Sequence, residues 1–530
     1  MTRNIIERTS GSNGAALRGF ALTLLVAVLA GGAIEASAQT GDDALRFLQR
    51  FPGVTAAQAG MGGTGSAGVA NSSAFVTNPA GLGWSDYSWV SGGISTIGVT
   101  EDALFNTPGG SFPLENDVSA TGLSDLSYVY KLPTRQGSFV AGVGIHQVRS
   151  FERSLLFDGE NNANSITDFF MPLPGEFTLE QDNQGVFPTF DRTLSFIAFE
   201  TFAIDLDQGL LDAGDPVPFL PAVSFGTVEQ TGFVEEEGRV TEINIGGGVE
   251  VAPNVMVGVG LNIPFGTYRF TRIHQELDFR NDNDGMSNGT TDFDYLEFTE
   301  TFETEMVGIN LRTGVSAEVA PGARIGLSVE TPTYLALQDN FDTRLRVEFD
   351  NGDIYEYGDD RSEDAGSGEF DYEITSPWKV GLGGSFNRSG FTVAADAEWV
   401  DWSQMEISAD GVSFADENRA IRRGLDAVLN LRLGASYELN DVIFRGGYAM
   451  YPDPHDYTLA NLDADLPDRD KTFVSAGIGY RFSDKVRIDL GWIRAQFDDE
   501  YRPYTEVDGA PVVDEEVSVD RFSLGFTFGF

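Results

Sequence analysis

The sequence predicts an all-β fold, namely a transmembrane antiparallel β-barrel of about 14 strands with an N-terminal plug inside its lumen. Apolar residues alternate with small or polar ones at a period of two along much of the chain. Short turns between these segments alternate with long polar connections. After the N-terminal leader no run approaches the ~18 consecutive apolar residues of a membrane helix. A closed barrel satisfies every backbone group in lipid, so the strands are expected to span the membrane.

The N-terminus has the pattern of an export signal. Three arginines precede an apolar run at residues 20–30, and Ala36-Ser37-Ala38 follows as a small-x-small cleavage site. The run is too short to span a membrane of ~20 helical residues. We therefore predict that residues 1–38 are a signal peptide, cleaved after Ala38, and that the mature protein reaches the outer membrane.

Composition narrows the possible functions. The formal net charge of −47 excludes nucleic-acid binding, which requires basic surface against phosphate. We interpret the acidic residues as solvated surface suited to a salty habitat, where self-repulsion is screened, with divalent-cation binding by acidic loops as the alternative. The chain has no Cys, and its three His are far apart without a His-Glu-x-x-His pattern. We expect no cofactor, no metal and no enzymatic activity.

The C-terminal ten residues carry the clearest alternation. Large apolar residues occupy every second position up to the end of the chain: Phe522, Leu524, Phe526, Phe528 and Phe530. A terminal strand that ends on an aromatic residue resembles the assembly signal of Gram-negative outer-membrane barrels. We expect these residues to be recognised by the barrel-assembly machinery during biogenesis.

Upstream, alternating segments occur in pairs joined by short turns. Six such pairs are 474–482 with 486–492, 429–439 with 442–448, 378–386 with 391–399, 309–319 with 325–329, 243–251 with 255–263, and 126–132 with 139–145. A strand near 87–99 and the last strand bring the total to about 14, an even number as bacterial barrels require. We expect the barrel to occupy residues 87–530.

The connections between these pairs are long and polar, at 101–121, 150–239, 272–301 and 335–374. Short periplasmic turns alternating with long external loops are typical of outer-membrane barrels. Charged residues occupy the faces opposite the apolar ones, which predicts a wet lumen. They are Arg432, Arg445, Arg481, Arg487, Asp489, Asp396 and Glu398.

Residues 39–86 precede the first strand and are expected to plug the lumen. A barrel of about 14 strands is too wide to be filled by its own side chains. Small residues let the plug backbone pack closely against the wall, Pro79 fixes a turn, and Asn78 can hydrogen-bond locally or to the wall. The residues assigned to the plug are Gly60, Met61, Gly62, Gly63, Asn78, Pro79, Ala80 and Gly81.

With Ala59 before it and Leu82 after it, this pattern resembles the hatch of the FadL/TodX family of long-chain fatty acid and hydrocarbon transporters. The segment from Glu398 to Ser403, with Trp399 and Trp402, is similar to the tryptophan-rich strand end of that family. The resemblance implies capture of a hydrophobic molecule by the external loops, passage into the barrel, and lateral release through the wall after the hatch shifts. Candidate capture residues in the loops are Phe105, Phe112, Phe169, Phe170, Met171 and Leu173.

The predicted function is therefore uptake of long-chain fatty acids or hydrocarbons by a monomer whose partners are a hydrophobic small molecule and outer-membrane lipid. One alternative is a FadL-like barrel that acts as a partner or shuttle in protein secretion or surface attachment. A second alternative is a general porin, which should conduct ions steadily where a plugged transporter should not.

Overall fold

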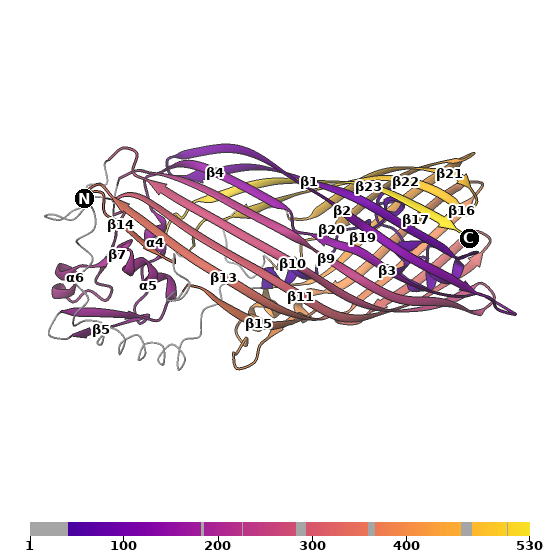
Figure 1. The fold of residues 1–530 in the computed structure, drawn as a ribbon, viewed down its shortest axis with the longest axis horizontal. Coiled ribbons are helices and arrows are strands. Elements are labelled where there is room, and N and C mark those ends of the chain that lie inside the picture. The colour runs from indigo at the N-terminus through magenta and orange to yellow at the C-terminus, as the bar shows by residue number, and fades with distance from the viewer. Residues whose placement is uncertain are drawn as a thin grey trace, which may run out of the picture.

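The computed structural model describes residues 41–181, 185–224, 226–281, 293–358, 366–456, 469–505 and 507–530, so the predicted signal peptide lies outside the described residues. One antiparallel sheet closes on itself as a 14-strand barrel (Figure 1). Closure occurs between the first strand, β1 (Trp89–Thr107), and the last, β23 (Val512–Gly529), which pair from Trp89 opposite Gly529 onward. The predicted fold class is confirmed.

Several strands of the barrel are interrupted. β3 and β4 both pair with β9, and β12 and β13 both pair with β11. On their other edges β12 pairs with β16 and β13 pairs with β15. Pro332 and Pro377 lie in the last two interruptions, where a residue without an N–H breaks the ladder. The remaining strands of this sheet are β2 (Gly110–Leu132), β3 (Phe139–Ser150), β4 (Arg153–Asn161), β9 (Val228–Ala252), β10 (Val255–Leu277), β11 (Phe293–Ala320), β12 (Ala323–Glu330), β13 (Tyr334–Phe349), β14 (Ile354–Tyr357), β15 (Gly368–Thr375), β16 (Lys379–Arg388), β17 (Phe391–Asp401), β18 (Glu406–Ser408), β19 (Ala427–Leu439), β20 (Val442–Tyr451), β21 (Lys471–Ser483) and β22 (Val486–Tyr501).

The six predicted hairpins are all present. Their short turns use residues that tolerate a left-handed backbone, such as Asn440 at φ 55° and Gly322 at φ 79°. The long connections are different from the expectation. Residues 101–121, expected to be a loop, continue β1 and β2 as a paired hairpin up to Thr107 opposite Gly110.

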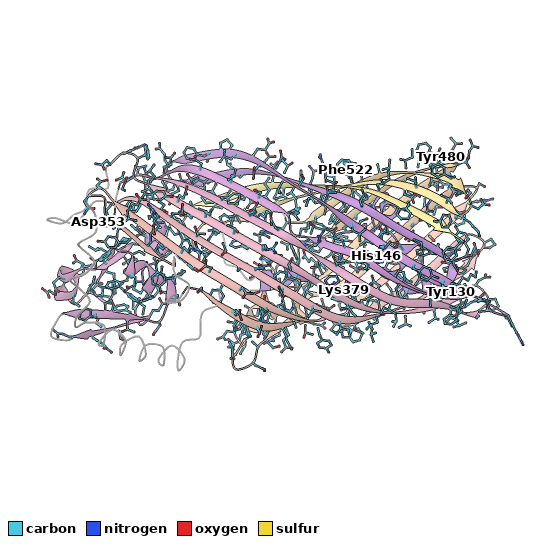
Figure 2. All side chains as sticks on the ribbon, viewed as in Figure 1. Tyr130, His146, Asp353, Lys379, Tyr480 and Phe522 are labelled. Carbon is cyan, nitrogen blue, oxygen red and sulfur yellow. The ribbon has the colours of Figure 1, made fainter. Side chains whose placement is uncertain are left out.

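The outer surface carries the apolar band that the alternation predicts. Phe522, Tyr480 and Tyr130 lie on it with 58%, 46% and 44% of their surface exposed, whereas His146 and Lys379 point into the lumen (Figure 2). The five terminal apolar residues from Phe522 to Phe530 all face outward. This exposed face fits hydrocarbon, and the inward polar residues fit a protein-filled interior.

Between β4 and β9 the chain forms a small subdomain at one end of the barrel, which we call the loop subdomain (Figure 1). Its buried apolar residues pack together with Phe298 of β11 and Leu345 of β13. Its elements are α4 (Ile166–Phe169), β5 (Phe177–Gln181), β6 (Val186–Phe190), α5 (Thr193–Glu200), β7 (Ile204–Leu206), α6 (Gln208–Ala213) and β8 (Phe219–Pro221).

Residues 41–86, here called the N-terminal segment, lie inside the barrel against the inward faces of its strands. The segment contains α2 (Gly41–Leu48), α3 (Ala56–Ala59), η1 (Ser72–Phe75) and η2 (Pro79–Trp84). Helix α2 buries Leu45, Phe47 and Leu48 in an apolar cluster with wall residues. In the described part of the chain, no helix has the length and apolar character needed to cross a membrane.

Candidate functional site

The glycine-rich run of the N-terminal segment packs directly on the barrel backbone. A Cβ added at Gly60 would lie 2.9 Å from the Cα of Gly477, and one added at Gly62 would lie 2.8 Å from the nitrogen of Tyr448. Gly62 and Gly63 also have φ of 64° and 80°. A side chain is therefore excluded at Gly60 by the wall, at Gly62 by the wall and the backbone conformation, and at Gly63 by its conformation and by Pro52.

The Asn-Pro-Ala turn contacts the opposite part of the wall. The Asn78 side chain caps η2 by accepting from Ala80 N at 3.1 Å, and its amide donates to the carbonyl oxygens of Ser66 at 2.8 Å and Val315 at 3.2 Å. Pro79 stands at the start of η2, where its missing N–H costs nothing. A Cβ at Gly258 of β10 would lie 2.2 Å from Ala80 N, so this wall position must also be glycine.

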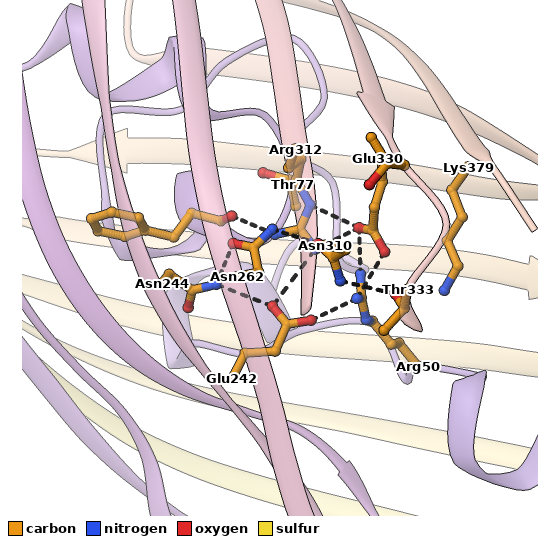
Figure 3. Close-up of polar contacts among 12 residues, drawn as sticks. Arg50, Thr77, Glu242, Asn244, Asn262, Asn310, Arg312, Glu330, Thr333 and Lys379 are labelled. Atoms are coloured by element: carbon orange, nitrogen blue, oxygen red, sulfur yellow. Dashed lines mark hydrogen bonds and ion pairs between the residues drawn. The ribbon is translucent and has the colours of Figure 1, made fainter. Parts of the chain in front are cut away.

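A group of buried charges ties the N-terminal segment to the barrel, and we call it the inner ionic cluster: Arg50, Glu242, Arg312 and Glu330 (Figure 3). Arg50 binds Glu330 at 2.8 Å and Glu242 at 2.5 Å. Arg312 of β11 binds Glu330 at 2.5 Å and donates to the carbonyl of Phe75 at 2.5 Å. The two positive and two negative charges balance, which makes their burial tolerable.

Beside this cluster, three asparagines form a ladder across adjacent strands (Figure 3). Asn244 donates to Asn262 at 2.8 Å, and Asn262 donates to Asn310 at 2.7 Å. His146 joins the ladder at Asn244 over 2.6 Å and bonds Ser72 of the N-terminal segment over 2.8 Å. The ladder satisfies polar side chains that water does not reach.

The barrel wall is not fully hydrogen-bonded between β2 and β4. β2 pairs with β3 from Asp125 to Leu132, whereas β4 pairs with β9, and within the described residues no backbone ladder joins 110–124 to β4. A bulge near Arg149 and the break after β3 turn the chain away from β2. Side-chain donors bridge the two strands instead: Asn116 Nδ2 donates to Ser154 Oγ at 2.6 Å and to the Ser154 carbonyl at 2.9 Å. We call this interruption the wall gap.

The junction of β3 and β4 also lines an internal cavity of about 340 Å³. Arg149 faces it with its guanidinium over the rings of Phe51 at 4.5 Å and Phe151 at 5.8 Å. Its buried Nε and NH1 atoms have no hydrogen-bond partner among the described residues. The rest of the lining mixes charged side chains, among them Glu101, Arg153, Glu236, Lys471 and Asp499, with apolar ones: Leu45, Ile97, Val99, Phe497, Val517 and Val519. The cavity thus combines an apolar and a charged lining, in which the Arg149 guanidinium has two nitrogens without a hydrogen-bond partner among the described residues.

Helix α2 is also held by a histidine in the connection after β20. His455 contacts Asp42 at 2.8 Å and Asp453 at 2.6 Å. Burial lowers the pKa of His455, but the hydrogen bonds to Asp42 and Asp453 outweigh it and raise the pKa to about 9. The imidazole is therefore protonated near neutral pH and joins α2 to this connection through ion pairs.

Trp399 and Trp402, predicted as an aromatic pair at a strand end, lie on opposite faces of the barrel wall. Trp399 is 42% exposed on the outer face, whereas Trp402 is buried and faces Lys379 Nζ at 5.5 Å from its ring centroid. The short helix η3 (Trp402–Gln404) rotates the chain after β17 and ends the alternation. Among the candidate capture residues Phe105 and Phe170 are fully buried, whereas Leu173 is 52% exposed.

Sequence reasoning did not select the inner ionic cluster, the wall gap or Arg149. A partial signal exists, because Arg312 and Glu330 occupy inward positions in strands whose outward residues are apolar. The pairing of Arg50 with Glu330 and Glu242 joins residues 280 and 192 positions apart and could not be read from local spacing.

The model of the outer membrane protein transport protein family (OMPP1/FadL/TodX) matches residues 217–530, more than half of the chain. The chain belongs to this family. As a FadL/TodX family member it is an outer-membrane transport protein, in a family of transporters and not of enzymes.

Three individual proteins are similar to the chain to different extents. Alkane uptake protein A of Marinobacter nauticus is 31% identical over 142 residues, which cover 25% of this chain and 31% of that protein, less than a third of its length. A Pseudomonas aeruginosa FadL homologue superimposes with a TM-score of 0.52 at 15% identity, covering 91% of this chain and 99% of its own. The Pseudomonas putida toluene transporter TodX gives a TM-score of 0.48 at 15% identity, covering 92% and 100%. At this identity the P. aeruginosa structure supports the fold alone.

Proposed function

We propose that this FadL/TodX family protein takes up hydrophobic molecules, either long-chain fatty acids or hydrocarbons, and releases them sideways through the wall gap. The observation that carries the proposal is the position of the cavity beside Arg149, which is lined by the same β3–β4 junction that interrupts the wall. The name of the alkane uptake relative supports a hydrocarbon substrate. Lateral release delivers an apolar solute into hydrocarbon without exposing it to water.

The N-terminal segment is proposed to be the hatch of the transporter, following a cleaved signal peptide of residues 1–38. Its close packing at Gly60, Gly62 and Asn78 supports this role, because a tight fit inside the lumen excludes free passage of ions and water. The external loops are proposed to capture the substrate, with Leu173 as an exposed apolar contact. The terminal apolar residues from Phe522 to Phe530 are proposed as the assembly signal.

Arg149 is proposed to receive the carboxylate of a fatty acid. Its buried guanidinium has free donors, and a carboxylate is the partner that would satisfy them. The tail would then lie along the apolar side chains of the cavity. A hydrocarbon would use the same apolar surface without the charged contact.

The test is binding of a labelled long-chain fatty acid and a labelled alkane to the detergent-purified protein. Both should bind saturably and compete. Arg149→Gln should weaken fatty-acid binding about tenfold or more, the loss expected for a charged hydrogen bond of ~1.5–3 kcal/mol, and leave alkane binding unchanged. Arg135→Gln, in an exposed turn between β2 and β3, serves as the matched control and should change neither.

Failure of both ligands to bind would contradict the uptake proposal. Copurification of a stoichiometric protein partner in that case would favour the secretion or attachment role, and steady ion conduction would favour a porin. Equal loss of fatty-acid and alkane binding in Arg149→Gln would contradict the headgroup assignment alone.

A further inference from the structure

A second group of buried charges lies at the start of β4, toward the end of the barrel that carries the loop subdomain (Figure 1). Arg153 binds Glu515 of β23 at 2.5 Å, Glu101 of β1 at 3.2 Å and Glu236 of β9 at 3.4 Å. We call these four residues the outer ionic cluster. The three carboxyl groups are at most 8% exposed, so one guanidinium holds three buried acidic side chains together.

The strands of this cluster stand on both sides of the wall gap. β9 pairs with β4, and Glu236 is the direct cross-strand neighbour of Arg153. β1 and β23 belong to the other side, because β2 pairs with β1 and β1 pairs with β23. Arg153 therefore reaches through the lumen from one side of the gap to the other.

Burial raises the pKa of Glu101 to about 8, and the contact with Arg153 opposes this rise. Neither of its carboxylate oxygens accepts a hydrogen bond within the described part of the chain. Without Arg153, three acidic side chains would remain close together at low exposure, and those that stay ionised would repel each other. The repulsion would act between β1 and β23 on one side and β9 on the other.

The same cluster touches the N-terminal segment. Arg46 of α2 approaches the second oxygen of Glu236 with its Nε at 3.5 Å, while its NH1 is held by Asp43 at 2.5 Å on the same helix. Glu236 thus lies between one guanidinium of the wall and one of the N-terminal segment. Displacement of α2 would remove Arg46 from Glu236 and leave it with the wall residues Arg153, Arg149 and Tyr268.

We infer that Arg153 holds together the strands on the two sides of the wall gap, a role that we call the clasp. Helix α2 controls the strength of this contact through Glu236. With α2 in place, both guanidiniums compensate the carboxylates and the strands beside the gap stay together. When α2 moves, Glu236 loses one partner, the attraction that holds β4 across the lumen weakens, and the gap widens. Arg153 is a positioning residue, and its role rests on the proposed lateral release.

The test measures the width of the gap directly. Because the chain has no Cys, spin labels at Ser119→Cys on β2 and Asp158→Cys on β4 report one distance by pulsed electron resonance. Arg153→Gln should lengthen and broaden this distance by roughly 1–2 Å, because the two labels are offset by about seven residues along the strands and a separation of one ~5 Å inter-strand spacing is measured obliquely. Arg46→Gln should give a smaller shift in the same direction, and Arg153→Lys should restore much of the original distance.

One further variant keeps the inference testable if Arg153→Gln does not fold, and a second serves as the control. Arg153→Gln with Glu515→Gln removes one carboxylate together with its partner, and should fold with a widened gap. Arg269→Gln removes an exposed pair with Glu303 on the outer face and should leave the distance unchanged.

An unchanged distance in the folded Arg153 and Arg46 variants would overturn the inference. The distance requires no substrate, so the outcome is separate from that of the uptake proposal. A gap that widens in a protein that binds neither ligand would support the clasp and contradict the transport role.

Discussion

Cross-linking β2 to β4 across the wall gap is expected to reduce uptake to the level of cells that lack the protein. The side chains of Asn116 and Ser154 already touch over 2.6 Å, so cysteines at both positions can be joined by a short reducible bridge. The bridge prevents the two strands from separating, and a substrate that leaves sideways is then retained. Uptake of a labelled alkane, measured before and after reduction, gives the result.

The matched control uses the same chemistry where the wall is continuous. Thr96 and Thr121 face each other across β1 and β2 with their hydroxyls 2.8 Å apart, and these strands pair by backbone hydrogen bonds. The Thr96→Cys, Thr121→Cys bridge should leave uptake unchanged. Full uptake through the Asn116–Ser154 bridge would show that the substrate leaves by another route.

Deleting residues 42–86 is expected to convert a closed barrel into an open pore. The deletion removes the N-terminal segment from the lumen, including the contacts of Gly60, Gly62 and Asn78 with the wall. The remaining strands still close between β1 and β23, so the product should stay folded and heat-modifiable. Single-channel recording should change from a silent baseline to a steady current.

A cross-linked form of the full chain provides the control for this deletion. Ser72 and Ser127 lie with their hydroxyls 2.6 Å apart, so a disulfide between cysteines at these positions fixes the N-terminal segment to β2. This form should remain silent in the same recording. If the deletion variant folds but its conductance equals that of the full chain, the proposed hatch does not close the barrel.

The barrel could be predicted from the sequence because lipid imposes one rule on every strand. Residues such as Leu431, Leu433 and Phe522 must face hydrocarbon, so their alternation marks the strands. Outside the lipid this rule no longer holds. Residues 101–121 have polar residues on the outward face, which removes the alternation although their backbones still pair. The predicted loop there was wrong for this reason.

The candidate site was less accessible to sequence reasoning. The small residues of the N-terminal segment were selected by their composition, which does not say what they contact. The wall gap depends on where β3 ends and turns from β2, and this is set by a bulge near Arg149. The outer ionic cluster joins Arg153 to Glu515, which is 362 positions away. Trp399 and Trp402 were separated by a helical turn that no alternation predicts.

Uptake of a labelled long-chain alkane and a labelled long-chain fatty acid, by cells with and without the protein, tests the central claim most directly. Lateral release of hydrophobic molecules predicts rapid, saturable entry of at least one ligand in cells that produce the protein, and slow entry in cells that lack it. Equal rates of entry for both ligands in the two kinds of cell would contradict it.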